Sequence, residues 1–152
     1  MKQVELLAEE FQKLFNGASW IDVNIVATLA SLNAEQAAAK PFANVNSIWE
    51  IVNHLVNWRE AVLKRVNGIE FPSPENNFFE PVADISPKAW NETLQRLHKS
   101  QNAWTAALYK MDDSDLEKQS ATRKQMKYEL ISGILQHDAY HLGQVVILKK
   151  FV

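Results

Sequence analysis

Apolar residues recur every three or four positions along most of this chain, which is the spacing of helices with one buried face. The first run fills residues 4–15, and Gly17 follows it as a natural helix stop. The segment 19–22 begins with Ser and ends with Asp, so we expect it to cap a second helix that continues to about residue 32. Asn33 is expected to cap one further turn.

A stronger start signal lies at Ser47, three residues before Glu50. In such a capping box the two side chains satisfy free backbone N–H groups at the start of a helix. This helix is expected to end near Gly68. Its apolar stripe consists of Ile48, Ile51, Leu55, Trp58, Val62 and Val66. His54 lies at the edge of that stripe, within roughly 60° of it around the helix axis.

Residues 69–85 contain three prolines and three phenylalanines, a composition that prevents regular structure but supplies apolar anchors. An antiparallel pair of helices needs a much shorter connection. We therefore expect this segment to cross the bundle and to leave the helices on either side of it parallel. A long connection of this kind also commonly forms part of a pocket wall.

Two further helices complete the pattern. The Ser-Pro pair at 86–87 gives an N-cap and a first helical residue, and apolar positions continue from there to residue 111. Thr122 and Gln125 have capping-box spacing, so the last helix is expected to begin there and to end near Lys150. No strand pattern is present. The sequence predicts an all-α protein, a bundle of helices.

The composition is that of an ordinary globular chain, since 47% of the 152 residues are hydrophobic and 22% are charged. This length suits one domain over residues 1–152. A net charge of -2 lacks the basic excess that phosphate binding needs, so nucleic acid is not an expected partner. The N-terminus does not resemble a signal peptide, and no stretch reaches about 18 apolar residues. We expect a cytoplasmic protein with no membrane partner.

Two histidines interrupt the apolar row of the last helix. His137 and His141 are one turn apart, so their rings leave the same face. Because the chain has no cysteine, a transition metal would need His, Asp or Glu ligands. His54 is the best candidate for a third imidazole, which would leave positions open for water or substrate. Spacing alone leaves another interpretation open, since such pairs also arise by chance and edge histidines are often hydrogen-bonded core residues.

Four other residues are candidates for the same site. Asp138 follows the first histidine of the pair, as Glu does in the zinc-protease motif, and could act as a general base or orient a histidine. Its alternatives are a solvated side chain or a partner for another polar group. Gln144 could surround a bound ion or hydrogen-bond within the bundle. Asn57 and Trp58 are candidate pocket residues, with a solvated Asn and a core Trp as the alternatives.

Several segments resemble the DinB-like superfamily, in that family's order along the chain. They are Gly17-Ala-Ser-Trp20, Ser47-Ile-Trp-Glu-Ile-Val-Asn-His54, Trp58 and His137-Asp-Ala-Tyr-His-Leu-Gly-Gln144. The resemblance spans nearly the whole chain and implies a four-helix bundle with up-down-down-up topology. It also implies that His54, His137 and His141 bind one metal ion, which in such sites is usually nickel or zinc.

The resemblance implies more than one activity. The superfamily includes S-transferases that use bacillithiol or mycothiol and a mycothiol-dependent maleylpyruvate isomerase, and the fold does not choose among them. We expect a metal-dependent enzyme that transfers a low-molecular-weight thiol, such as bacillithiol, to a small electrophilic substrate. A metal-dependent hydrolase and a non-catalytic metal-binding module are the alternatives. Family habit, together with five Trp and seven Phe, also predicts a homodimer.

Overall fold

The computed structural model describes residues 2–121 and 123–152. Four long helices carry the fold: α1 (Gln3–Asn16), α4 (Ile48–Val66), α5 (Pro87–Leu108) and α7 (Lys127–Leu148). Shorter helical segments are α2 (Ile25–Leu29), α3 (Ala34–Ala38), α6 (Asp113–Leu116) and the 3-10 turn η1 (Lys149–Phe151). The described part of the chain contains no strand, so the predicted all-α class is confirmed. None of its helices is long and apolar enough to cross a membrane.

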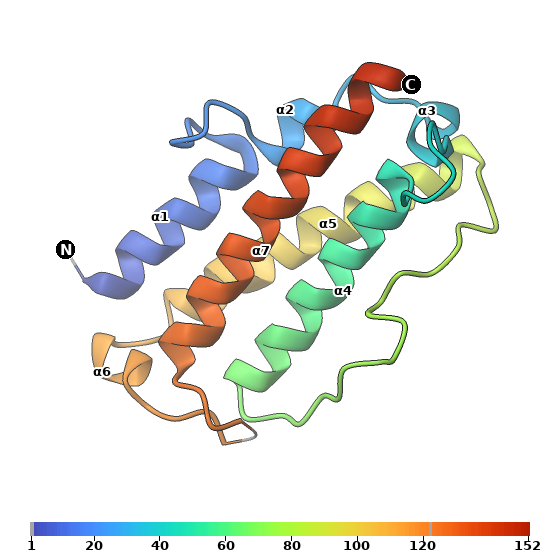
Figure 1. Cartoon of the computed structure of the whole chain (residues 1–152). Coiled ribbons are helices and arrows are strands. Elements are labelled where there is room, and N and C mark those ends of the chain that lie inside the picture. The colour runs from blue at the N-terminus through green and yellow to red at the C-terminus, as the bar shows by residue number, and fades with distance from the viewer. Residues whose placement is uncertain (1, 122) are drawn as a thin grey trace.

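Helices α4 and α5 run in one direction, and α1 and α7 run in the opposite direction (Figure 1). Contacts between the helices agree with this arrangement. Trp49 packs against Trp90 near the starts of α4 and α5, whereas Arg59 reaches Ser100 farther along both helices. The connection between these two parallel helices therefore runs along the length of the bundle, on the outer side of α4.

Most of the expected helix boundaries are confirmed by hydrogen bonds. Ser47 and Glu50 form the capping box, in which the Glu50 N–H donates to Ser47 Oγ and the Ser47 N–H donates to Glu50 Oε2. Asn33 forms a capping box with Gln36 at the start of α3, and the Ser86 side chain caps α5 by accepting a hydrogen bond from the Ala89 N–H. Gly68 ends α4 with a φ of 79°, a left-handed conformation that favours glycine.

Two expected helix starts are wrong. Helix α2 begins at Ile25 rather than at 19–22, because Asn24 provides the cap and accepts a hydrogen bond from the Ala27 N–H at 2.8 Å. Asp22 has a φ of 59°, which no α-helix contains. Helix α7 begins at Lys127, where the N–H of its N-cap residue donates to the Glu129 carboxylate. Thr122, the expected cap, lies outside the described residues.

Two groups of buried apolar side chains fill the bundle, one toward each end. The first group includes Trp49, Trp90 and Val145, and the second includes Phe11 and Trp104. A layer of buried polar residues lies at the level between them, and it consists of Arg59, Ser100, Gln101, Asp138 and the histidines His54 and His141. The fold thus places polar chemistry in the middle of an otherwise apolar bundle.

Candidate metal centre

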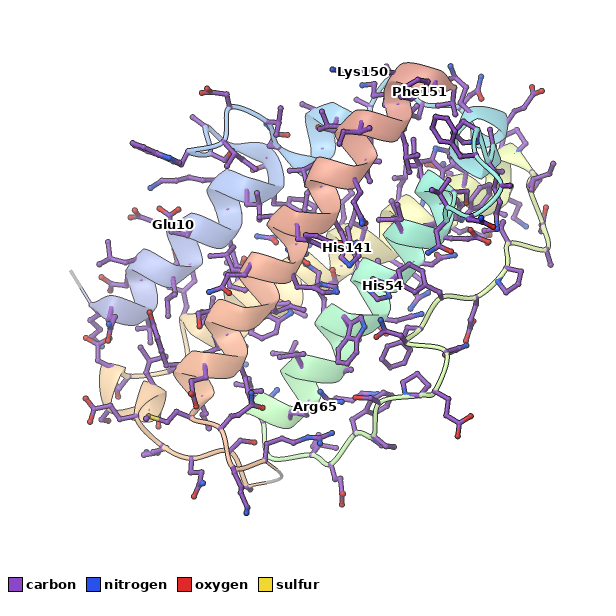
Figure 2. The ribbon with its side chains drawn as sticks, viewed as in Figure 1. Glu10, His54, Arg65, His141, Lys150 and Phe151 are labelled. Atoms are coloured by element: carbon purple, nitrogen blue, oxygen red, sulfur yellow. The ribbon has the colours of Figure 1, made fainter. Side chains whose placement is uncertain are left out.

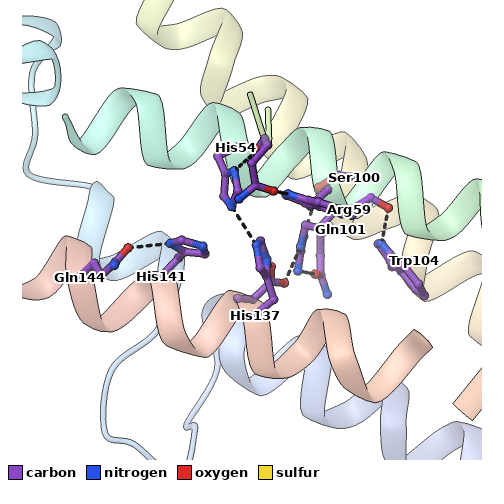
Figure 3. Close-up of polar contacts among 11 residues, drawn as sticks. His54, Arg59, Ser100, Gln101, Trp104, His137, His141 and Gln144 are labelled. Carbon is purple, nitrogen blue, oxygen red and sulfur yellow. Dashed lines mark hydrogen bonds and ion pairs between the residues drawn. The ribbon is translucent and has the colours of Figure 1, made fainter. Parts of the chain in front are cut away.

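The three histidines predicted as metal ligands lie together between α4 and α7. His54 comes from α4, and His137 and His141 come from successive turns of α7. Each offers one ring nitrogen, and these nitrogens all lie within 4.8 Å of one another. The His54 Nε2 is 2.9 Å from the His137 Nε2 (Figure 3). Two nitrogens bound to one ion at about 2.0–2.1 Å each lie about 3 Å apart, so this spacing suits a shared ion.

A strained turn in the connection after α4 orients His54. Asn77 and Phe78 have φ values of 52° and 61°, a left-handed conformation that is unusual for two consecutive residues with side chains. The turn brings the Asn77 carbonyl to 2.7 Å from the His54 Nδ1, and Phe79 stacks on the imidazole. Because a carbonyl can only accept, the His54 Nδ1 carries the proton, and its Nε2 lone pair faces the other histidines.

Gln144 orients the second ring. Its Oε1 lies 2.6 Å from the His141 Nδ1, and its amide nitrogen donates to the Tyr140 hydroxyl at 3.2 Å. In this arrangement the His141 Nδ1 is protonated, so its Nε2 is free to bind a metal. Gln144 therefore lies beside the site. It also hydrogen-bonds within the bundle, as the alternative interpretation of this residue proposed.

The third ring, His137, is left with an unsatisfied nitrogen. Because the His54 Nε2 can only accept, the His137 Nε2 must donate to it, which leaves the His137 Nδ1 unprotonated. That Nδ1 lies 3.7 Å from the Asp138 Oδ1, and among buried side-chain atoms of the described residues these two lack a hydrogen-bond partner. A cation on the three Nε2 atoms would resolve the conflict, since the His137 Nδ1 would then carry a proton facing the carboxylate.

The protonation states also favour metal binding. Burial, followed by the charge of a protonated His141, lowers the pKa of His54 to about 4. Burial likewise lowers the pKa of His141 below its usual value. Both imidazoles are therefore neutral near pH 7, which is the form that binds a metal ion.

Comparison with known families agrees with this geometry. A sequence model of the DinB superfamily matches residues 23–145, a segment that contains all three histidines. The chain belongs to the DinB superfamily. Comparisons with curated proteins and with solved structures give no match. In this DinB-superfamily chain, the buried cluster of three histidines is compatible with a metal site.

Asp138 links the histidines of this DinB-superfamily bundle to a buried arginine. The Arg59 Nε donates to the Asp138 Oδ2 at 2.7 Å, and the rest of the guanidinium donates to Ser100 and Gln101. Asp138 is 0% exposed, so it is the partner of a polar group and not a solvated side chain. Sequence reasoning missed Arg59. Its place four residues after the buried Leu55 was the available signal, because that spacing puts it on the core face.

A cavity of about 370 Å³ opens beside the histidines. Trp58 lines it and donates through its Nε1 to the Asn77 Oδ1 at 3.1 Å. Asn57 does not line it, because its Oδ1 accepts a hydrogen bond from Arg96 on α5. Asp138 is also absent from the lining. Figure 2 labels His141 on α7 next to His54 on α4.

Proposed function

We propose that His54, His137 and His141 bind one divalent transition metal, and that this chain is an enzyme that transfers a low-molecular-weight thiol to an electrophile. The observation that carries the proposal is the convergence of three ring nitrogens beside a cavity. Two of these rings are held by hydrogen bonds to Asn77 and Gln144. A metal bound there would lower the pKa of a thiol at an open position, because three neutral ligands leave the ion its full charge.

The chain's own residues would bind and orient the reactants. The protein has no cysteine, so the thiol must be a second small molecule. In the transfer, sulfur forms a bond to the electrophilic carbon, the leaving group departs with its electron pair, and the thiol proton passes to solvent. Trp58 and the apolar side chains of the cavity would bind the electrophile and exclude water from it. Three imidazoles suit both nickel and zinc, the two metals expected from the family.

The placement of Asp138 does not favour the hydrolase alternative. A general base must come within hydrogen-bond reach of the water that it activates. Asp138 is fully buried, is bonded to Arg59 and does not line the cavity. We therefore assign it the role of orienting His137, which was the intermediate possibility inferred from the sequence.

Metal binding is tested first, with protein purified without an affinity tag. After reconstitution with zinc or nickel, we expect elemental analysis to find about one ion per chain. The ion should be lost from the double variant His137→Ala and His141→Ala. His98→Ala is the matched control, because His98 is an exposed histidine of α5. Equal metal content in the double variant and the wild type would show that His137 and His141 are not the metal ligands.

Activity is tested with a panel of bacillithiol, mycothiol, glutathione or no thiol, against an aryl halide and a simple ester. We expect thiol-dependent turnover of the metal-loaded protein that is lost in His141→Ala and kept in His98→Ala. Ester cleavage without thiol that is lost in Asp138→Asn, although this variant still carries its metal, would favour the hydrolase instead. Metal binding with neither activity would favour the non-catalytic module.

A further inference from the structure

The cavity that begins at the histidines has a cationic side chain, Arg65, at its other end. Arg65 lies in the last turn of α4 and lines the same cavity as His54. In Figure 2, His54 lies near the middle of α4 and Arg65 at its lower end. Trp58 joins these two ends, since its ring lies 6.4 Å from the His54 ring and 5.3 Å from the Arg65 Cζ. A ligand that lies along the Trp58 ring would therefore approach both ends.

Arg65 is buried without a counter-ion. Only 6% of the residue is exposed. Its Nε donates to the Phe71 carbonyl at 2.9 Å and its Nη2 to the Ser73 Oγ at 3.0 Å. Within residues 2–121 and 123–152, its Nη1 has no hydrogen-bond partner but is not fully buried, and no carboxylate forms an ion pair with it. A buried charge that lacks an opposite charge is unfavourable, so this end of the cavity attracts an anion.

A second arginine strengthens the positive charge there. The Nη2 of Arg123 also reaches the Phe71 carbonyl, at 3.4 Å. The pKa of Arg65 is lowered, first by burial and then by the charge of Arg123. Glu129 lines the cavity too, but it is exposed to solvent and its Oε2 accepts a hydrogen bond from the Met126 N–H at 2.7 Å. It therefore offsets the two cations only weakly.

The walls between the two ends are largely apolar. Val62 on α4 and Leu130 and Ile134 on α7 line this stretch together with Trp58. Gly133 lies between them on α7, and no other residue would contact a Cβ at that position, so the wall is open there. An apolar passage with a cation at one end suits an amphipathic anion rather than a uniformly polar molecule.

We propose that this cavity binds an organic acid with an apolar body, whose carboxylate pairs with Arg65 and whose other end lies toward the three histidines. Guanidinium groups bind carboxylates through parallel N–H donors, and the Arg65 Nη1 is the free donor. Binding of the acid needs no metal. Only the assignment of such an acid as the electrophilic substrate rests on the proposed thiol transfer.

Arg65 also has a structural role, which the test must distinguish from anion binding. It fixes the connection after α4 through Phe71 and Ser73. Ser73→Ala removes one of these hydrogen bonds and leaves the cation in place. Arg65→Gln removes the cation, and Arg123→Gln removes the neighbouring charge from an exposed position. A loss of binding caused by the connection alone would appear in Ser73→Ala as well.

The experiment is titration calorimetry on metal-free protein in the presence of a chelator, with 4-phenylbutanoate and its uncharged amide as probes. Without a metal, the carboxylate of the probe cannot coordinate an ion at the histidines. We expect the acid to bind at least about tenfold more tightly than the amide, because a hydrogen bond between two charged groups is stronger than one to a neutral group. Arg65→Gln should weaken acid binding by about tenfold, and Arg123→Gln by only a few-fold, because exposed charges are screened. Ser73→Ala should stay within about twofold of the wild type, because it keeps the cation.

Three results would overturn the proposal: no binding of the acid at millimolar concentration, equal affinities for the acid and the amide, or equal losses in Ser73→Ala and Arg65→Gln. If Arg65→Gln does not fold, the salt dependence of the wild type decides. Acid binding should weaken as sodium chloride is raised and amide binding should not, and parallel behaviour of the two probes would overturn the proposal. Acid binding without any thiol-dependent turnover would reject the proposed function and leave this inference standing.

Discussion

At the scale of single residues, the Arg59–Asp138 pair lies directly behind His137. The carboxylate bonds the guanidinium through its Oδ2 and faces the His137 Nδ1 with its unsatisfied Oδ1. A buried ion pair adds little net stability over well-packed apolar residues, whereas removing only one partner leaves a charge without compensation. We infer that this pair serves the orientation and basicity of His137 more than the stability of the bundle.

This view predicts that replacing both partners restores most of the stability but does not restore metal binding. Arg59→Met should destabilise the metal-free protein by about 3–5 kcal/mol, because it leaves the Asp138 charge buried and unpaired. Adding Asp138→Leu should recover more than half of that loss. The double variant should still bind zinc about 10–100-fold more weakly than the wild type, because the His137 Nδ1 has lost its carboxylate. Urea denaturation and zinc titration measure the two effects. Wild-type zinc affinity in the double variant would contradict this assignment.

The lowered pKa of His54 predicts a pH dependence of stability in the metal-free protein. Its pKa is about 4 in the fold, against 6.5 for an ordinary histidine. Between these values the unfolded chain binds more protons than the folded one, so stability falls as the pH drops from 6.5 toward 4. We expect the wild type to lose roughly 2 kcal/mol more than His54→Gln between pH 7.5 and 4.5. Urea midpoints at the two pH values measure this difference, and equal losses would refute it.

At the scale of elements, the connection between α4 and α5 does more than join parallel helices. It brings the Asn77 carbonyl to the His54 Nδ1, stacks Phe79 on the ring and contributes Asn77 to the cavity wall. All of this depends on the left-handed backbone at Asn77 and Phe78. Asparagine tolerates that conformation better than most residues.

Two substitutions at Asn77 should therefore differ in their effect on metal affinity. Asn77→Gly removes the side chain but allows the left-handed turn, so the carbonyl stays on His54 and zinc affinity should remain within a few-fold of wild type. Asn77→Val disfavours the turn because its side chain is β-branched, and zinc affinity should fall by about 10–100-fold. Zinc titration of both variants makes the comparison. If both bind zinc equally, the carbonyl does not orient His54.

At the scale of the whole molecule, the bundle has a core that does not depend on the histidines. The four long helices contribute buried apolar residues on both sides of the polar layer. A metal that binds only the folded state adds stability by mass action, about 2.7 kcal/mol at a hundredfold excess over Kd. The metal should therefore strengthen this fold without being needed to form it.

Chelation should lower the melting temperature and leave helicity at 25 °C unchanged. Circular dichroism of protein loaded with zinc or nickel, before and after addition of a chelator, tests this expectation. Small zinc domains unfold when their metal is removed. A collapse of the helical signal on chelation would show that this bundle also folds only with its metal.

The predicted homodimer can be tested by light scattering at tens of micromolar. Several large apolar side chains are exposed on the single chain, and Trp20, in the loop after α1, is 97% exposed. Burial in a dimer would remove such surface from water. We expect the mass of two chains, and the mass of one chain would refute the prediction.

The sequence by itself determined the four long helices, most of their caps and the pairing of His137 with His141, because these depend on spacing along a single helix. His54 lies on another helix, so its choice as a third ligand rested also on the resemblance to the DinB-like superfamily. The spacing of His137 and His141 fixes their common face, and Ser47 with Glu50 fixes the start of α4. Asn24 and Asp22 show where local reasoning failed: a better cap and a left-handed residue displaced the expected start of α2. Only the tertiary structure could pair Arg59 with Asp138, or bring the Asn77 carbonyl to His54, since these partners are distant in sequence. Such contacts depend on how helices pack and how an irregular connection folds back, and no periodicity in the chain encodes either.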